Sequence, residues 1–143
     1  MLVISLVLAA LAAVPESDPL EYAFIAQARI ADESDGSANR WPNMAALEDG
    51  RIMVVWSHQP PGDAEDAIVA SFSRDCGCTW TPPKAILATA GFVDADPSIA
   101  VSGTRVFVSC TAVKDDGINT STQWFIRSED NGETWSEPYV VSF

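Results

Sequence analysis

Short apolar runs separated by turn-forming residues occur along the chain in two successive sets of four. Gly-containing turns at 48–50 and 102–103 join the first two runs of each set. Val, Ile and Phe are frequent in the runs, which have the length of β-strands. The pattern therefore predicts an all-β chain with two four-stranded antiparallel sheets. The predicted strands are 42–47, 51–56, 67–72 and 84–87, then 97–101, 106–110, 123–127 and 139–141.

An octapeptide pattern, S-x-D-x-G-x-T-W, lies between the third and fourth run of both sets. The copies begin at Ser73 and Ser128, 55 residues apart, and Pro42 and Pro97 are separated by the same interval. A repeat of this length is typical of propellers and solenoids. Asp accepts backbone hydrogen bonds in turns, Gly adopts positive φ, and Trp buries a large apolar surface. The fixed positions are Ser73, Asp75, Gly77, Thr79 and Trp80, then Ser128, Asp130, Gly132, Thr134 and Trp135.

Both octapeptides match the Asp-box, or bacterial neuraminidase repeat, in every fixed position. From about residue 39 onward, the chain resembles the N-terminal part of a sialidase-like six-bladed β-propeller. The resemblance implies a partial propeller at 20–143, with blade A at about 40–90 and blade B at about 95–143. Two blades cannot close a ring, so we expect the remaining blades of a longer chain, or self-association, to complete it.

The resemblance also implies a site for the carboxylate of a terminal sialic acid, which the family holds with three arginines. Arg40 stands two residues before Pro42, where the family has its first arginine, although Trp41 replaces the family's Ile. A guanidinium suits a carboxylate because it forms bidentate, charge-assisted hydrogen bonds. The alternative for Arg40 is a surface position in a loop.

Asp94 and Asp96 match an Asp-Pro-Ser pattern of the family on the inner strand of the second blade. Inner strands line the central funnel, so the resemblance implies that Asp96 contributes to the pocket wall, with Asp94 the other candidate. A role in the turn before Pro97 is the alternative.

The family's acid/base is an Asp on the loop that corresponds here to 58–66. Asp63 fits this role best and Asp66 is the alternative, although a solvated acidic loop explains both equally. A carboxylic acid there can protonate the leaving oxygen and then activate water. His58 and Gln59 stand where the family often has its second arginine. The family's nucleophilic Tyr, its activating Glu and its last arginine lie in later blades, so we expect the isolated chain to be inactive.

Three hypotheses for the function remain open. The first is the N-terminal part of a secreted, retaining exo-sialidase-like hydrolase that acts on terminal sialic acids of glycans. The second is a non-catalytic Asp-box propeller that binds glycan or protein, which the missing second arginine favours. The third is a two-blade module that completes a ring by association. Further arginines and a Tyr/Glu pair in later blades would distinguish the first from the second.

The N-terminal segment and the composition limit the expected localisation, partners and cofactors. Residues 1–13 are apolar and end in small residues, which predicts a signal peptide and a secreted or periplasmic protein without a membrane span after cleavage. A net charge of −12 disfavours nucleic acid. His58 is the only histidine, so we expect no metal and no other cofactor. Three cysteines, Cys76, Cys78 and Cys110, leave at least one unpaired within the chain.

Overall fold

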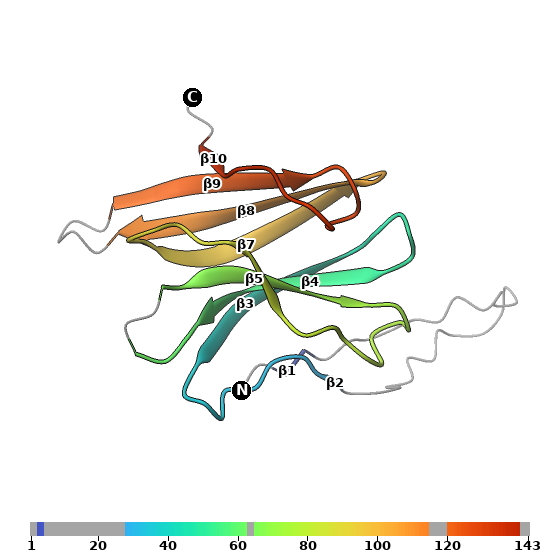
Figure 1. Ribbon diagram of the computed structural model, residues 1–143, viewed down its shortest axis with the longest axis horizontal. Coiled ribbons are helices and arrows are strands. Elements are labelled where there is room, and N and C mark those ends of the chain that lie inside the picture. The colour runs from blue at the N-terminus through green and yellow to red at the C-terminus, as the bar shows by residue number, and fades with distance from the viewer. Residues whose placement is uncertain (1–2, 5–27, 63–64, 115–119, 141–143) are drawn as a thin grey trace, which may run out of the picture.

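Two four-stranded antiparallel sheets form the body of the molecule (Figure 1). The computed structural model describes residues 3–4, 28–62, 65–114 and 120–140. The first sheet has the order β3–β4–β5–β6 and the second β7–β8–β9–β10, so strands follow one another in chain order. The strands are β3 (Ala38–Ala46), β4 (Ile52–Gln59), β5 (Ala67–Ser73), β6 (Lys84–Leu87), β7 (Val93–Ser102), β8 (Arg105–Lys114), β9 (Thr120–Ser128) and β10 (Tyr139–Val140).

The remaining described strands are β1 (Val3–Ile4) and β2 (Ala28–Arg29), which pair antiparallel. Apart from residues 3–4, the predicted signal peptide at 1–13 lies outside the described residues. Within the described ranges, no helix has the length and apolarity needed to cross a membrane. The prediction of an all-β chain with two four-stranded antiparallel sheets is confirmed.

The two sheets pack face to face through one apolar core. Alternate residues of a strand point to opposite faces, so each of the central strands contributes every second side chain to this core. Removing these apolar side chains from water is the main favourable contribution to the association of the sheets. The buried members include Met53, Val55, Ile68 and Ala70 from the first sheet, and Val106, Val108, Cys110 and Ile126 from the second.

A second, smaller core covers the opposite face of the first sheet. Val54, Trp56 and Val69 form it together with Ala31, from the segment that precedes β3. Trp80, the last residue of the first octapeptide, packs against this core, whereas Trp135 of the second octapeptide packs against the core between the sheets. The two octapeptide Trp side chains therefore lie on equivalent faces of their sheets. Trp80 is on the face of the first sheet that is turned away from the second, and Trp135 is on the face of the second sheet that is turned toward the first.

The two octapeptides fold in the same way. Asp75 accepts hydrogen bonds from the backbone N and the Oγ1 of Thr79, at 2.8 and 2.5 Å, and Asp130 accepts the matching pair from Thr134, at 2.9 and 2.6 Å. These bonds favour the ionised carboxylate and lower the pKa of Asp75 and of Asp130 to about 2. The turn thus depends on its own side chains.

Two consecutive left-handed residues reverse the chain inside each octapeptide. Their φ angles are 59° at Cys76 and 88° at Gly77, and 57° at Asn131 and 85° at Gly132. A side chain is disfavoured at Gly132 for a second reason, since an added Cβ would lie 3.2 Å from the ring of Phe72 in the other sheet. The second turn is therefore fitted closely against the first sheet.

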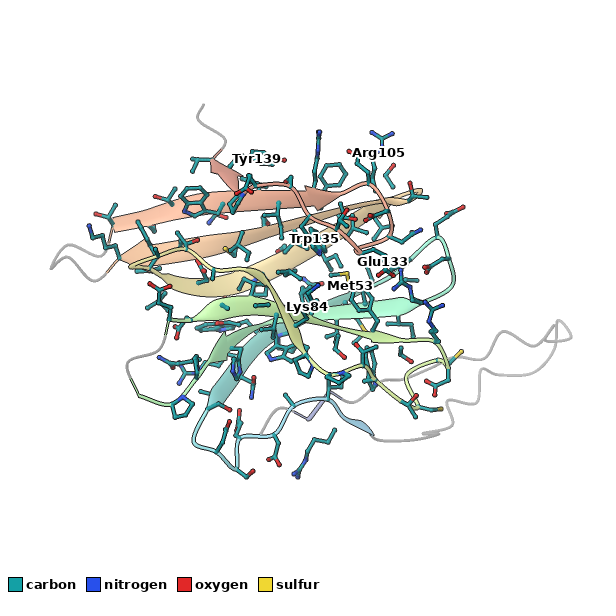
Figure 2. The ribbon with its side chains drawn as sticks, viewed as in Figure 1. Met53, Lys84, Arg105, Glu133, Trp135 and Tyr139 are labelled. Carbon is teal, nitrogen blue, oxygen red and sulfur yellow. The ribbon has the colours of Figure 1, made fainter. Side chains whose placement is uncertain are left out.

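Arg51 joins the first sheet to the second octapeptide. Its guanidinium forms ion pairs with Asp49, at 2.7 Å, and Glu133, at 2.6 Å, and donates to the carbonyl oxygen of Asn131, at 3.0 Å. The guanidinium also lies 4.8 Å from the ring centroid of Phe72, and Arg51 is only 5% exposed. Figure 2 shows Met53, Glu133 and Trp135 gathered at this end of the interface.

Replacing Arg51 by Met should destabilise the protein, because the Asn131 carbonyl loses its donor and two carboxylates lose their partner. We expect the free energy of unfolding to fall by about 2 kcal/mol in urea titrations. Arg105 is the matched control, since it lies next to the second octapeptide and its ion pair among the described residues is an exposed 3.9 Å contact with Glu129. Arg105→Met should change stability by less than about 0.5 kcal/mol. Equal effects of the two substitutions would contradict the role given to Arg51.

The octapeptide carboxylates should make the free energy of unfolding depend on pH in the acidic range. The folded-state pKa of Asp75 and Asp130 is about 2, below the ordinary 3.8, so their stabilisation is complete above pH 3.8 and is lost as pH falls through 2. The double variant Asp75→Asn/Asp130→Asn should have a lower urea midpoint at pH 5 and a shallower decline between pH 5 and pH 2. Parallel declines for the two proteins would show that these carboxylates do not contribute.

Candidate functional site

The inner strands of the two sheets, β3 and β7, are in contact at the interface, and this contact places the candidate residues. The Ser57 hydroxyl, on β4, donates to the carbonyl oxygen of Asp94, on β7, at 2.6 Å and ties the sheets together here. Both inner strands change register at the same point of the repeat, between Arg40 and Asn43 and between Ala95 and Ser98. The site is thus built at a pair of matching β-bulges.

Each bulge contains a left-handed residue directly before a proline. Trp41 has φ 53° and Asp96 has φ 48°, and both are exposed. Positive φ is uncommon for a residue other than Gly, and tolerated better by Asp than by Trp. Such strain is concentrated at functional sites, where the surrounding structure holds it in place. The bulges therefore single out positions 41 and 96 of the repeat.

Trp41 lies beside Arg40. The guanidinium carbon of Arg40 is 6.0 Å from the Trp41 ring centroid, at the outer limit of a cation–π contact, and Trp41 is 44% exposed. In the sequence, Trp41 stands only as the replacement of a family Ile, and it is not among the predicted site residues. The sequence feature that could have indicated Trp41 is an aromatic residue between an Arg and a Pro.

Asp66 is buried at the same end of the first sheet as Arg40. It lies immediately before β5 and is only 6% exposed. Burial raises the pKa of the Asp66 carboxyl, and the positive charges of Arg40 and His58 oppose this rise. The structure thus brings Arg40 and Asp66 within electrostatic range of each other. Asp63, the first choice for the acid, lies outside the described residues.

Asp94 is enclosed rather than exposed. It is fully buried, and its Oδ2 accepts a hydrogen bond from the backbone N of Thr89 at 2.8 Å. Burial raises the pKa of Asp94, and the negative charge of Asp66 raises it further. The Cys110 thiol, 3.8 Å from Oδ1, has its own pKa raised to about 12, mainly by burial. Asp94 therefore supports the inner strand, whereas Asp96 presents its side chain to solvent.

Among the described residues, the cysteines and the potential metal-ligating side chains do not add to this site. Cys76 and Cys78 are exposed and free, and Cys110 is free and buried. Across the described part of the chain, no three His, Cys, Asp or Glu side chains are grouped as a metal site requires. The candidate residues that remain are Arg40, Trp41 and Asp96, which are exposed, and Asp66, which is buried. They include a cation for an anionic group, an aromatic ring, and a carboxyl whose pKa is raised.

Comparison with solved structures identifies the architecture. A Dyadobacter fermentans protein of unknown function matches with a TM-score of 0.63 and 18% identity, over 74% of this chain and 37% of its own. The Hadza microbial sialidase Hz136 matches with a TM-score of 0.60 and 22% identity, over 72% and 26%. Trypanosoma rangeli sialidase in complex with sialic acid matches with a TM-score of 0.57 and 15% identity, over 73% and 20%. No protein-family model and no curated protein sequence matches the chain.

These structural matches establish the fold. The chain has a sialidase-like β-propeller fold, of which the two sheets are a part, as the sequence predicted. The matched region spans less than two-fifths of each of these three solved chains. At such identities the likeness carries no activity across to this chain.

Asp66 should be a destabilising residue at neutral pH. Because its folded-state pKa is raised, the folded protein binds a proton there more readily than the unfolded chain, and stability attributable to Asp66 rises as pH falls toward its unfolded value of 3.8. Asp66→Asn should therefore raise the melting temperature at pH 7, with a smaller gain at pH 4. A melting temperature that is lowered at pH 7 would contradict this account of Asp66.

Proposed function

We propose that this chain is the N-terminal part of a secreted, sialidase-like glycoside hydrolase that acts on terminal sialic acids of glycans. The observation that carries the proposal is that Arg40 and the buried carboxyl of Asp66 lie at the same end of the first sheet, on a sialidase-like fold. The matching octapeptides, interpreted as Asp-boxes, support the same family. The apolar segment at 1–13 supports secretion.

Arg40 has the role of holding the substrate's carboxylate. Its guanidinium provides two parallel N–H donors, which match the two oxygens of a carboxylate. The ring of Trp41, 6.0 Å from the guanidinium carbon, offers an apolar surface next to it. Asp96, exposed at the equivalent bulge of the second sheet, contributes a polar wall. Binding is thus specified by charge and by the shape of the two bulges.

A carboxyl of the 58–66 loop has the role of general acid/base. A raised pKa keeps part of the acid protonated, so that it can transfer a proton to the leaving glycosidic oxygen. The carboxylate formed by that transfer can then accept a proton from the attacking water. Asp66 has the required burial, and Asp63 keeps the better match to the family in sequence. The nucleophile and the further arginines of the family belong to blades beyond these two.

A non-catalytic glycan-binding propeller is the second candidate. His58 occupies the place where the family often has its second arginine, and its Nδ1 is engaged with the Asn39 amide oxygen at 2.9 Å. With that arginine missing, carboxylate binding rests on Arg40 within these two blades. A propeller that binds sialylated glycans without cleaving them needs only this part of the arrangement.

The test is binding of α-methyl sialoside to the 143-residue chain, followed by NMR. We expect a dissociation constant in the millimolar range, because two blades provide only part of a pocket. Arg40→Met should abolish binding, whereas Arg105→Met, which removes an exposed arginine elsewhere, should leave it unchanged. Binding by the Arg40→Met variant as tight as that of the parent chain would refute the proposal.

Two further variants assign the acid. An ionised carboxylate next to the bound sialoside repels it, so removing that charge should tighten binding at pH 7. Asp63→Asn and Asp66→Asn are therefore compared, and the one that tightens binding severalfold marks the carboxyl that faces the ligand. No change with either variant would remove both residues from the site. An aryl sialoside should not be hydrolysed by any of these chains.

A further inference from the structure

Two buried carboxyl groups lie on opposite sides of the contact between the sheets. Asp94, on β7, is fully buried, and Asp66, directly before β5, is only 6% exposed. β7 contacts both β4 and β5, so the two residues belong to elements that touch (Figure 1). Aspartate is rarely buried to this degree unless it is paired with a charge of the opposite sign. Two buried carboxyl groups in one contact therefore require an explanation.

The strand register turns both side chains toward this contact. Asp66 lies two residues before Ile68, whose side chain belongs to the core between the sheets. Because alternate residues of a strand share a face, Asp66 lies on the face of the first sheet that is turned toward the second. Asp94 lies opposite Ala112 on β8, two residues from Cys110 of the same core. Asp94 therefore lies on the face of the second sheet that is turned toward the first.

Neutral groups hold Asp94 in place. Its Oδ2 accepts from the backbone N of Thr89 at 2.8 Å, and the Cys110 thiol lies 3.8 Å from Oδ1. The Ser57 hydroxyl donates to the Asp94 carbonyl oxygen at 2.6 Å and so fixes this backbone against the first sheet. Among the described residues, the charge that acts on Asp94 is the negative charge of Asp66. Burial outweighs the donated hydrogen bonds, so the protonated form of Asp94 is favoured.

Asp66 faces positive charge instead. Arg40 on β3 and His58 on β4 both oppose the rise in the pKa of Asp66 that burial causes. A neighbouring cation stabilises the ionised form of a carboxyl, so the surroundings favour ionisation of Asp66 over that of Asp94. The negative charge of an ionised Asp66 in turn raises the pKa of Asp94. Two carboxyl groups that interact strongly titrate in two separate steps.

We propose that Asp66 and Asp94 form one acid pair across the contact between the sheets, in which Asp66 ionises first and Asp94 holds the remaining proton. The pair then carries a single negative charge near Arg40 until Asp94 loses its proton. Asp94 is a positioning residue, which acts on the ligand through the charge of the pair and without contact. This role rests on the proposed function, because the charge of the pair matters for binding only if Arg40 holds a carboxylate.

The first test is a pH titration of the aspartate side-chain carboxyl ¹³C resonances in the full chain. We expect Asp94 to titrate at a higher pH than Asp66. In Asp66→Asn the neighbouring negative charge is removed, so Asp94 should titrate at a lower pH than in the parent chain. Asp96→Asn is the matched control, because Asp96 is exposed on the same strand, and it should leave both titrations unchanged. An Asp94 titration that is identical in the parent and in Asp66→Asn, or that lies below that of Asp66, would refute the pair.

The second test is the pH dependence of α-methyl sialoside binding in the parent chain and in Asp94→Asn. As pH rises through the Asp94 titration, a second negative charge develops near Arg40. We expect the parent's affinity to fall about three- to tenfold over this range. Asp94→Asn cannot develop the charge and should keep its affinity. A purely structural effect of the substitution would change affinity by the same factor at every pH, and that result would refute the positioning role.

The two tests fail in different ways. An absence of sialoside binding at every pH would refute the role given to Arg40 in the proposed function, and the carboxyl titrations alone then decide whether the pair exists. Uncoupled titrations together with sialoside binding that depends on Arg40 would refute the pair and leave the proposed function standing. If the melting curve shows that Asp94→Asn does not fold, Asp66→Asn measures the same coupling from the other carboxyl.

Discussion

The structure depends on the contact between two sheets that are each too thin to be stable alone. A four-stranded sheet has two faces, and one of them must be covered by another apolar surface. Here the faces are joined by Met53, Val55, Val106 and Val108, all of them essentially buried. Arg51 fixes the relative position of the sheets at the octapeptide end, because its ion pairs and hydrogen bond require Asn131 and Glu133 to lie in one place. The inner strands, and with them the candidate site, take their positions from this contact.

Local chemistry explains what the sequence predicted. The octapeptides form the same hydrogen bonds because Ser, Asp, Gly and Thr recur at the same spacing and bond within eight residues. The central strands were predicted well for a similar reason, since their apolar residues are continuous. Inner strands β3 and β7 are longer than expected, beginning at Ala38 and Val93, because the bulge before each proline interrupts the apolar pattern without ending the strand.

Contacts between distant residues explain what the sequence did not predict. Arg51 donates a hydrogen bond to Asn131, which is 80 residues away in the chain, and the spacing of residues within one repeat does not predict that contact. Arg40 is predicted as a site residue from its position before Pro42. The exposure of its neighbour Trp41 was not predicted, because Trp41 lies in the left-handed backbone of the bulge. The burial of Asp66 likewise arises from packing around the end of the first sheet. Its sequence context is that of an ordinary acidic loop.

The central claim is that the Arg40 end of the inner strands binds the carboxylate of a sialic acid. The most direct measurement is a crystal structure of the chain soaked with sialic acid. The account predicts the ligand's carboxylate within hydrogen-bond distance of the Arg40 guanidinium, next to the Trp41 ring. A ligand bound elsewhere, with Arg40 left uncontacted at saturating concentration, would contradict it.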